Sequence, residues 1–430
     1  MTRPTLTQAL TALTGAKPVT PADLAQAALF TLDAVASALA GRHTEPGAML
    51  LGWAREQSAD AGRRAFLLGA LTHILEVDDL HRAAVVHPGC VVVPAAWAVA
   101  ERERADGSTL LTAVLRGFEA AIRVGMAVGP AHYRIWHNTA TCGPFGSAMA
   151  AAALLGLDEA ATVHALGNAG TQSAGLWQFL ETGAMTKHLH AGRGAEAGVL
   201  AADLARLGFT GPPAILEGAK GFFAAMCPDA DPEAVIRRPN APWELLNTSL
   251  KPWPSCRHTH PAIDAAQALR ERVNPARIER IEVETYPAAL AVCDRPDPAS
   301  EYEAKFSLQH CVAAALTLER MDFDAFGPAA RAELAPLRAL VKSRVEESYA
   351  AAYPAAWGSA VSVLTRNGDR LSARRDHAKG DPEAPLARHE IIAKAAMLMT
   401  RGGVRDPQAL IQGILAMAEG GPVPVIPFGE

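Results

Sequence analysis

This sequence has no large excess of charge of one sign and no closely spaced cysteine pairs. The 40 Lys and Arg residues against 45 Asp and Glu leave a formal net charge of −5, and no run of basic residues stands out. There is therefore no electrostatic case for binding nucleic acid. The six cysteines form no CxxC pair, which excludes the usual spacing of a zinc ribbon or an iron–sulfur cage and suits reduced thiols.

The sequence also lacks the patterns that carry a chain into a membrane. Its first residues, MTRPTLTQALTALTG, have no unbroken apolar core like that of a signal peptide. No charge-free apolar window reaches 18 residues with the flanks of a membrane span. We therefore expect a cytoplasmic protein with neither a membrane nor a nucleic acid among its partners.

What the sequence does have is a helical texture over most of its 430 residues, a length that favours two domains. Half of the residues are hydrophobic, mostly Ala, Leu and Val, and only 6% are aromatic. Up to Asn247 the apolar residues recur at helical spacing, with Thr20 as a plausible cap before Pro21. We read 109–127, 143–155 and 158–223 as helical.

The texture changes after Lys251, where prolines break the chain. Ile278–Tyr286 alternates apolar with charged residues, which predicts a half-buried strand, and an Asn367-Gly368 turn joins two further strands at 359–365 and 370–374. Residues 306–320 and 327–347 read as helices. We predict a mainly α fold, with a large all-helical domain (residues 1–262 plus 392–430) and a smaller α+β domain (residues 263–391).

One stretch, residues 183–226, joins a basic cluster to a run of small residues. Lys187 and His190 are three residues apart and would share one helical face, which Gly194 and Gly198 continue. Glycine weakens a helix, so a glycine-rich start marks a place where a backbone or a ligand comes close. The face suits an anionic ligand, and a basic turn leading into a tightly packed helix explains it equally well.

Four further polar clusters interrupt apolar segments. They are the acidic and histidine group of Glu76, Asp78, Asp79, His81 and His87; the segment 136–141, with His137 and Thr141; the segment 256–260, with Arg257, His258 and His260; and His310 inside an apolar helix. Each has a structural explanation as well, since aspartates cap helices and a lone histidine is more often a satisfied core residue than a catalyst.

Several chemistries lack their patterns. The His-x-His pairs at 188–190 and 258–260 would diverge on a helix, and neither HExxH nor an EF-hand is present, so we expect no metal. Ser173 lacks the glycine two residues earlier that a nucleophile elbow needs. No GxGxxG or Walker loop is found, so we expect no cofactor. Acid–base chemistry on an anion remains, with Lys187, Arg257 and histidines as cations and proton carriers.

The motifs of these clusters, in this order, resemble the MmgE/PrpD family, which includes 2-methylcitrate dehydratase, cis-aconitate decarboxylase and iminodisuccinate epimerase. The resemblance runs through HILEVDDLHRAAVVHPGCVVVPA, WHNTATCGPFGSAMAAAALLGL, GNAGTQSAGL, MTKHLHAGRGAEAG, LGFTGPPAILEGAKGFF, KPWPSCRHTHPAIDA, KFSLQHCVAAAL and KGDPEAPL. It covers nearly the whole chain.

The resemblance implies a homodimer in which each large helical domain carries the smaller domain as a lid, with the site in the cleft between them. It also implies which residues act on the substrate. The implied catalytic residues are Asp78, His87, His137, Lys187 and His260, where Arg257 or His258 are alternative matches to His260. As substrate-binding residues we expect Asp79, Thr141, His190, Arg257, His258 and His310.

The resemblance further implies a cofactor-independent lyase of propionate metabolism. It would dehydrate a hydroxylated di- or tricarboxylate such as 2-methylcitrate by removing a proton next to a carboxylate. An epimerase or a decarboxylase acting on a related polycarboxylate is the alternative, and a non-catalytic carboxylate-binding dimer is the second. The chain departs from the family pattern at Glu76, Leu80 and His310, and these departures bear on which polycarboxylate is its substrate.

Overall fold

The computed structural model describes residues 3–57 and 60–426, which form two compact units. Unit 1 comprises residues 1–250 and 387–430, and unit 2 comprises residues 251–386. These boundaries differ from the expected ones at 262 and 391. Helix α12 (His260–Gln267) explains the first difference, because it packs against α15, β3 and β4 inside unit 2.

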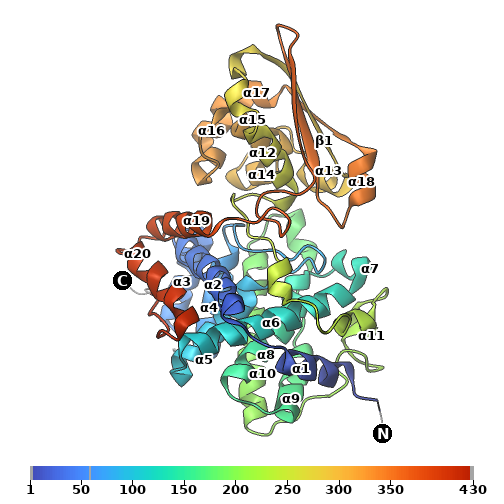
Figure 1. Cartoon of the computed structure of the whole chain (residues 1–430), viewed down its shortest axis with the longest axis vertical. Coiled ribbons are helices and arrows are strands. Elements are labelled where there is room, and N and C mark those ends of the chain that lie inside the picture. Colours follow the sequence, from blue (N-terminus) through green and yellow to red (C-terminus); the bar gives the residue numbers. More distant parts are fainter. Residues whose placement is uncertain (1–2, 58–59, 427–430) are drawn as a thin grey trace. The chain divides into compact units, whose positions relative to one another are not determined.

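The regular secondary structure of unit 1 is helical in its described part, as expected, and its helices are joined by loops with isolated β-bridges (Figure 1). Its C-terminal helices α19 and α20 return to pack on α2, which places the end of the chain with the large unit. The helices are α1 (Leu6–Ala16), α2 (Pro21–Gly41), α3 (Glu45–Arg55), α4 (Ala61–His73), α5 (Gly89–Glu103), α6 (Gly107–Ala127), α7 (Gly129–Tyr133), α8 (Asn138–Leu154), α9 (Glu159–Gly170), α10 (Thr186–Arg206), α11 (Phe222–Met226), α19 (Arg388–Arg401) and α20 (Pro407–Ala416).

Helix α2 starts as its sequence predicts. The Thr20 hydroxyl accepts a hydrogen bond from the backbone N–H of Asp23, whose side chain in turn accepts from the backbone N–H of Thr20, and Pro21 opens the helix. Within the described residues, α2 is the helix that is long and apolar enough to cross a membrane by length and composition. Most of it is buried in the core of unit 1, where it packs against α4, α6 and α19.

Helix α10 crosses α4 and α8 at close range because its small residues remove side chains from the interface. A Cβ added at Gly198 would overlap the Ser147 hydroxyl and the Ala148 backbone nitrogen of α8. A Cβ at Gly192 would lie 2.7 Å from the Phe66 carbonyl of α4. Close contact with neighbouring backbones therefore explains these glycines. Lys187 and His190 precede them, in the first turns of α10.

The helical reading of 158–223 was wrong between and after its two helices. Residues 207–221 are irregular, since Gly208, Gly211, Pro212, Gly218 and Gly221 interrupt helical hydrogen bonding. The segment between α9 and α10 holds a short 3₁₀ helix at Trp177–Glu181.

Unit 2 is an α+β unit, as expected. In its described residues, β1 (Ile278–Thr285), β2 (Val341–Val345), β3 (Ser359–Thr365) and β4 (Arg370–Arg375) form a sheet of order β2-β1-β3-β4. The pairs β1–β3 and β3–β4 are antiparallel. Its other helices are α13 (Pro287–Cys293), α14 (Glu301–Lys305), α15 (Leu308–Thr317), α16 (Pro328–Glu333), α17 (Ala335–Arg338) and α18 (Glu347–Ala352).

Strand β2 corrects the prediction of one helix over 327–347. Helix α16 ends at Glu333 and α17 ends at Arg338, and residues 341–345 pair in parallel with β1, Ile281 lying opposite Val341. An edge strand of five residues with three polar side chains has no clear alternation, and pairing with β1 decides its conformation.

Candidate active site

Three separate parts of unit 1 converge on a buried group of imidazoles. His73 ends α4, Asp78 and His87 come from the loop before α5, and His137 immediately precedes α8. His190 comes from the first turns of α10. The rings of His73 and His87 are 4.8 Å apart between centroids, and those of His73 and His137 are stacked at 5.6 Å.

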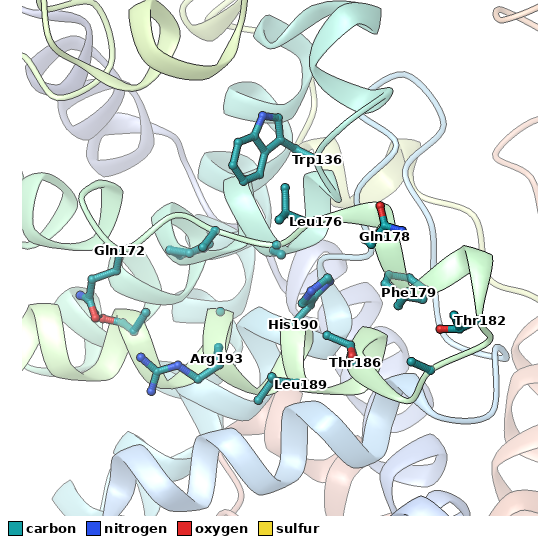
Figure 2. Close-up of a pocket in the computed structure, with 17 residues that line it drawn as sticks. Trp136, Gln172, Leu176, Gln178, Phe179, Thr182, Thr186, Leu189, His190 and Arg193 are labelled. Carbon is teal, nitrogen blue, oxygen red and sulfur yellow. Dashed lines mark hydrogen bonds between the residues drawn. The ribbon is translucent and has the colours of Figure 1, made fainter.

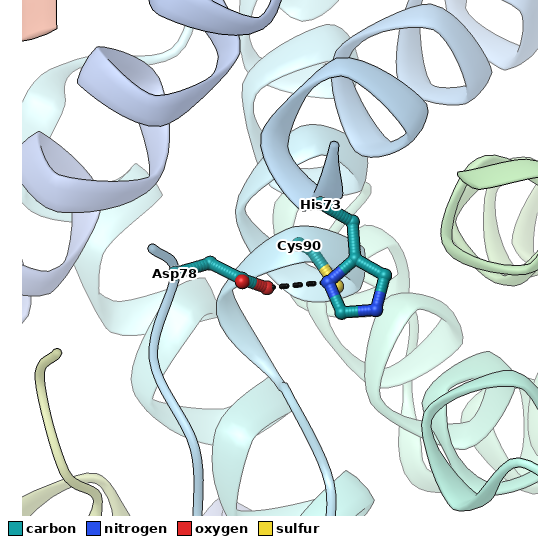
Figure 3. A group of neighbouring side chains, drawn as sticks. All are labelled: His73, Asp78 and Cys90. Atoms are coloured by element: carbon teal, nitrogen blue, oxygen red, sulfur yellow. Dashed lines mark hydrogen bonds and ion pairs between the residues drawn. The ribbon is translucent and has the colours of Figure 1, made fainter. Parts of the chain in front are cut away.

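Asp78 is the carboxylate of this group (Figure 3). The Nδ1–H of His73 donates a hydrogen bond of 2.6 Å to Asp78 Oδ2, and His87 Nδ1 lies 3.4 Å from the same oxygen. Burial alone would raise the pKa of Asp78, but the interactions with His73 and His87 hold it well below its ordinary value. Burial lowers the pKa of His73 to about 4. A carboxylate and a neutral imidazole thus form the pair at neutral pH.

His137 and His190 form the second pair. Their Nδ1 atoms are 3.2 Å apart, a hydrogen bond in which one ring donates and the other accepts. Burial, followed by the effects of His73 and Lys187, holds the pKa of His137 well below its ordinary value, and burial lowers that of His190 to about 4. The Trp177 ring lies 4.6 Å from the His137 ring between centroids, and His137 is almost fully buried.

On two stacked rings of the group, buried nitrogen atoms have no hydrogen-bond partner in the described part of the chain. They are the Nε2 atoms of His73 and His137, whose rings are stacked. Buried polar atoms in native proteins are nearly always hydrogen-bonded, and exceptions mark a function or a missing ligand. These two atoms therefore mark the place where a ligand would complete the hydrogen bonding.

Lys187 lies next to the imidazoles and forms an ion pair with Glu76. Glu76 has a left-handed backbone with φ of 58°, a strained conformation for a residue other than glycine. Its longer carboxylate, one of the departures from the family pattern, is the group that meets Lys187. His188, beside Lys187, has its pKa lowered to about 4 by burial, although Glu76 acts in the opposite direction.

Asp79 and Thr141 point elsewhere. Both Asp79 carboxylate oxygens accept from the backbone N–H of Gly89, each at 3.0 Å, and burial raises the pKa of Asp79 well above its ordinary value. A Cβ at Gly89 would lie 2.9 Å from each of those oxygens. The Thr141 hydroxyl is 2.8 Å from His132 Nε2 inside the core. Packing of the loop and of α8 accounts for both residues.

The predicted residues of unit 2 have protein partners of their own. Arg257 forms a buried ion pair with Asp381 and donates to His260 Nδ1 at 2.7 Å, while His260 Nε2 donates to the Ser255 carbonyl at 3.2 Å. His258 lies flat against Trp357 at 4.4 Å. His310 Nε2 donates to the Ala325 carbonyl at 2.8 Å inside the core of unit 2, while its Nδ1 is buried with no hydrogen-bond partner among the described residues.

A cavity of about 670 Å³ opens beside the imidazole group in unit 1 (Figure 2). His190 lies in the middle of its lining, with Leu176 and Phe179 close by in this view. Most of the lining is apolar, and Gln172, Gln178, Thr182, Thr186 and Arg193 add polar groups. The cavity is roomy enough for a small organic anion.

Three groups of described residues have possible metal ligands within 4.8 Å of one another: His73, Asp78 and Cys90; Asp78, Asp79 and His87; and His377, Asp381 and Glu383. Burial and the nearby Asp78 raise the pKa of the Cys90 thiol well above its usual range, and this thiol donates to the His87 carbonyl. Asp78 holds His73, Asp79 holds Gly89, and Asp381 holds Arg257. Hydrogen bonds and an ion pair account for these carboxylates, so we assign no metal to them.

Sequence reasoning brought Asp78, His87, His137, Lys187 and His190 together, and it missed His73 and the role of Glu76. The available signal for His73 was weak: a histidine at a helix end, five residues before an aspartate. Only the turn after α4 brings that histidine back onto Asp78.

The sequence is similar to those of several known enzymes. Cis-aconitate decarboxylase-like protein oryM of Aspergillus oryzae is 30% identical over 282 residues, 58% of each chain. Cis-aconitate decarboxylase of Aspergillus terreus is 27% identical over 271 residues (57% of this chain, 55% of the relative), and that of Mus musculus is 29% identical over 365 residues (80% and 73%). The match thus spans little more than half the length of the fungal relatives.

Family models match both units. The MmgE/PrpD N-terminal domain matches residues 12–235, and the MmgE/PrpD C-terminal domain matches residues 253–418. Together they cover most of the chain, and the resemblance drawn from its motifs is confirmed. The chain belongs to the MmgE/PrpD family.

Proposed function

We propose that this protein is a lyase that acts on a polycarboxylate by proton transfer from buried imidazoles. The observation that carries the proposal is His137, which is buried and neutral, with an Nε2 atom that lacks a partner in the described residues. Lys187 lies beside it and supplies a cation for a carboxylate. The names of the relatives support loss of carbon dioxide from cis-aconitate as the reaction.

In that reaction, the bond between a carboxylate and its neighbouring carbon breaks, and carbon dioxide leaves. The electron pair of this bond forms a new double bond, and the far carbon of the old double bond takes a proton. His137 Nε2 would donate this proton. A desolvated site favours the step, because a carboxylate that becomes neutral carbon dioxide loses its charge in surroundings that disfavour charge.

Dehydration of 2-methylcitrate or a similar hydroxylated acid is the second candidate. The observation that favours it is Asp78, which holds both His73 and His87 by one oxygen. His137 would remove the proton from carbon, and a histidine of the Asp78 group would protonate the departing hydroxide. Re-protonation of the same carbanion, an epimerisation, uses the same groups.

Incubation with cis-aconitate, 2-methylcitrate, citrate and iminodisuccinate tests these candidates. Released carbon dioxide supports the decarboxylase, growth of enoate absorbance supports the dehydratase, and a change in optical rotation alone supports the epimerase. Binding without turnover of any of them would favour a non-catalytic carboxylate-binding protein. His137→Asn should abolish the observed reaction, and the exposed His389→Asn is the matched control.

We further propose, from the family, a homodimer in which unit 2 acts as a lid. Light scattering on the eluted protein measures the mass directly, to be compared with 45.2 kDa for one chain. A mass of one chain at micromolar concentration would contradict the dimer.

A further inference from the structure

The contact between His137 and His190 joins two nitrogen atoms of the same kind. Their Nδ1 atoms are 3.2 Å apart, so exactly one proton lies between them when both rings are neutral. If His137 Nδ1 carries it, His137 Nε2 is a base and His190 Nε2 carries a proton. If His190 Nδ1 carries it, the roles reverse, and His137 Nε2–H becomes an acid. The tautomers of the two rings are therefore coupled.

The outer nitrogens of this pair face different surroundings. His137 is 1% exposed, and its Nε2 has no partner among the residues described, in the group with His73 and Lys187. His190 is 8% exposed and lines the 670 Å³ cavity (Figure 2). The pair thus spans the wall between the buried imidazoles and a space that admits water.

A proton transfer at His137 Nε2 alone would leave a charged ring in this desolvated place. Burial disfavours that charge, and the nearby His73, Lys187, His190 and His87 disfavour it further. The nearby carboxylate, Asp78, already interacts with His73 and His87. His137 can therefore exchange a proton at Nε2 without becoming charged only if a second proton moves at its other nitrogen, Nδ1.

We propose that His190 is a relay residue that lets His137 gain or lose a proton at Nε2 while both rings stay neutral. When His137 Nε2 gives its proton to the substrate, His137 Nδ1 takes the proton of His190 Nδ1, and His190 Nε2 takes one from water in the cavity. When His137 Nε2 takes a proton, the three transfers reverse and a proton leaves to the cavity.

Each cycle needs both directions. Donation to the substrate leaves His137 Nε2 unprotonated and a hydroxide in the cavity. After the product leaves, water in the emptied site gives a proton to His137 Nε2 and its hydroxide leaves with the solvent, while His190 Nε2 returns a proton to the hydroxide in the cavity. The proposal deepens the proposed function, because it needs a proton transfer at His137, and it applies to decarboxylation, dehydration and epimerisation alike. His190 acts through His137, so we class it as a positioning residue.

The tautomers can be observed without any turnover. In protein labelled with ¹⁵N-histidine, we expect His137 and His190 to be neutral at pH 6.5, with one Nδ1 protonated and the other not, and with a coupling between these nitrogens across the hydrogen bond. His190→Ala should remove the coupling and leave the other histidine signals in place. A charged His137, or two rings with independent tautomers, would overturn the relay.

Turnover gives the second test. His190→Ala should lose about 10²-fold in kcat, and free imidazole, which can enter the enlarged cavity, should restore at least tenfold of it in proportion to its concentration. The rate of wild type in H₂O–D₂O mixtures should curve with deuterium fraction, because several protons move together, and His190→Ala should give a straight line.

Two controls keep the outcomes distinct. His190→Gln keeps a side chain of similar size, so circular dichroism should show a folded protein, while its rate should still depend linearly on deuterium fraction. His389→Ala should match wild type. A His190→Ala enzyme within twofold of wild type, or one that is slow and insensitive to imidazole with the curve retained, would overturn the relay. If wild type turns over no carboxylate, the proposed function fails while the nitrogen spectra still decide the relay.

Discussion

The histidines of unit 1 and those of unit 2 have different surroundings. In unit 1, His73 and His137 each use Nδ1 in a hydrogen bond, face each other, and keep an Nε2 with no partner in the described chain. In unit 2, His260 has both nitrogens engaged, and His258 lies between a Tyr286 hydroxyl and the Trp357 ring.

We infer that a polar cluster in the sequence forms a reactive site only where its imidazole nitrogens lie close to one another and to a carboxylate in a buried position. Rings that bind separately to an arginine, a hydroxyl or a backbone carbonyl are held as structure. Five predictions test this difference between the two units.

The largest effect is expected on catalysis in unit 1. His137→Asn should lower kcat by roughly 10² to 10⁴ with cis-aconitate or 2-methylcitrate, whichever is the substrate, since it removes the proton-transfer nitrogen. His310→Asn in unit 2 should leave kcat within a fewfold and lower the melting temperature, because it disturbs the hydrogen bond to Ala325. Equal losses of kcat in both variants would break the comparison.

The role of Lys187 is tested by substituting it alone and together with its ion-pair partner Glu76. Lys187→Met should abolish turnover, but it also leaves Glu76 without its ion-pair partner in a buried place, so stability should fall as well. The double variant Lys187→Met/Glu76→Gln should regain stability and stay inactive. Activity retained in either protein would remove Lys187 from the mechanism.

The next effect is on the stability of unit 2. Asp381→Asn leaves the buried Arg257 without its carboxylate and should cost about 3–5 kcal/mol in the free energy of unfolding. Asp297→Asn removes the partner of Arg338, but this carboxylate is 92% exposed, and the cost should be about 0–1 kcal/mol. Urea denaturation measures both, and similar costs would contradict the structural role of Arg257.

A smaller effect follows from pH. The pKa values of His73 and His258 are about 4 in the folded chain, lowered by burial from 6.5. Between pH 6.5 and 4 the unfolded chain binds protons that the folded chain does not, so stability is complete above pH 6.5 and falls as the pH drops towards 4. Each such histidine contributes about 1.4 kcal/mol per pH unit.

Urea denaturation at pH 7 and pH 5 measures this slope. His258→Gln should flatten it by one proton without changing catalysis through the unit 1 group, and His73→Gln should flatten it while also lowering kcat through Asp78. A slope unchanged by both substitutions would show that these rings take up protons in the folded state.

The smallest effects concern packing by glycine in unit 1. Gly198→Ala puts a methyl group into Ser147 and Ala148 and should cost about 1–3 kcal/mol. Gly52→Ala, on exposed α3 with no atom within 4 Å of the new Cβ, should stabilise by about 0.5–1 kcal/mol. Melting temperatures should therefore move in opposite directions.

Local sequence signals predicted features of both units. The cap at Thr20, the face shared by Lys187 and His190, and the hairpin turn at Asn367-Gly368 each depend on residues a few positions apart, and each is present in the structure. Strand β2 was missed because its pairing with β1 lies 60 residues away, as Glu284 and Arg344 show. The Arg257–Asp381 ion pair was missed for the same reason.

The sequence by itself determined the helical and mixed units, the family, and the residue types that acid–base chemistry needs. Only the tertiary structure decided which nitrogen of each imidazole has a partner, that Glu76 meets Lys187, and that His73 belongs to the site. The physical reason is that hydrogen bonds act over about 3 Å and are directional. Their pairing therefore depends on where α4, α8 and α10 cross, which no local pattern encodes.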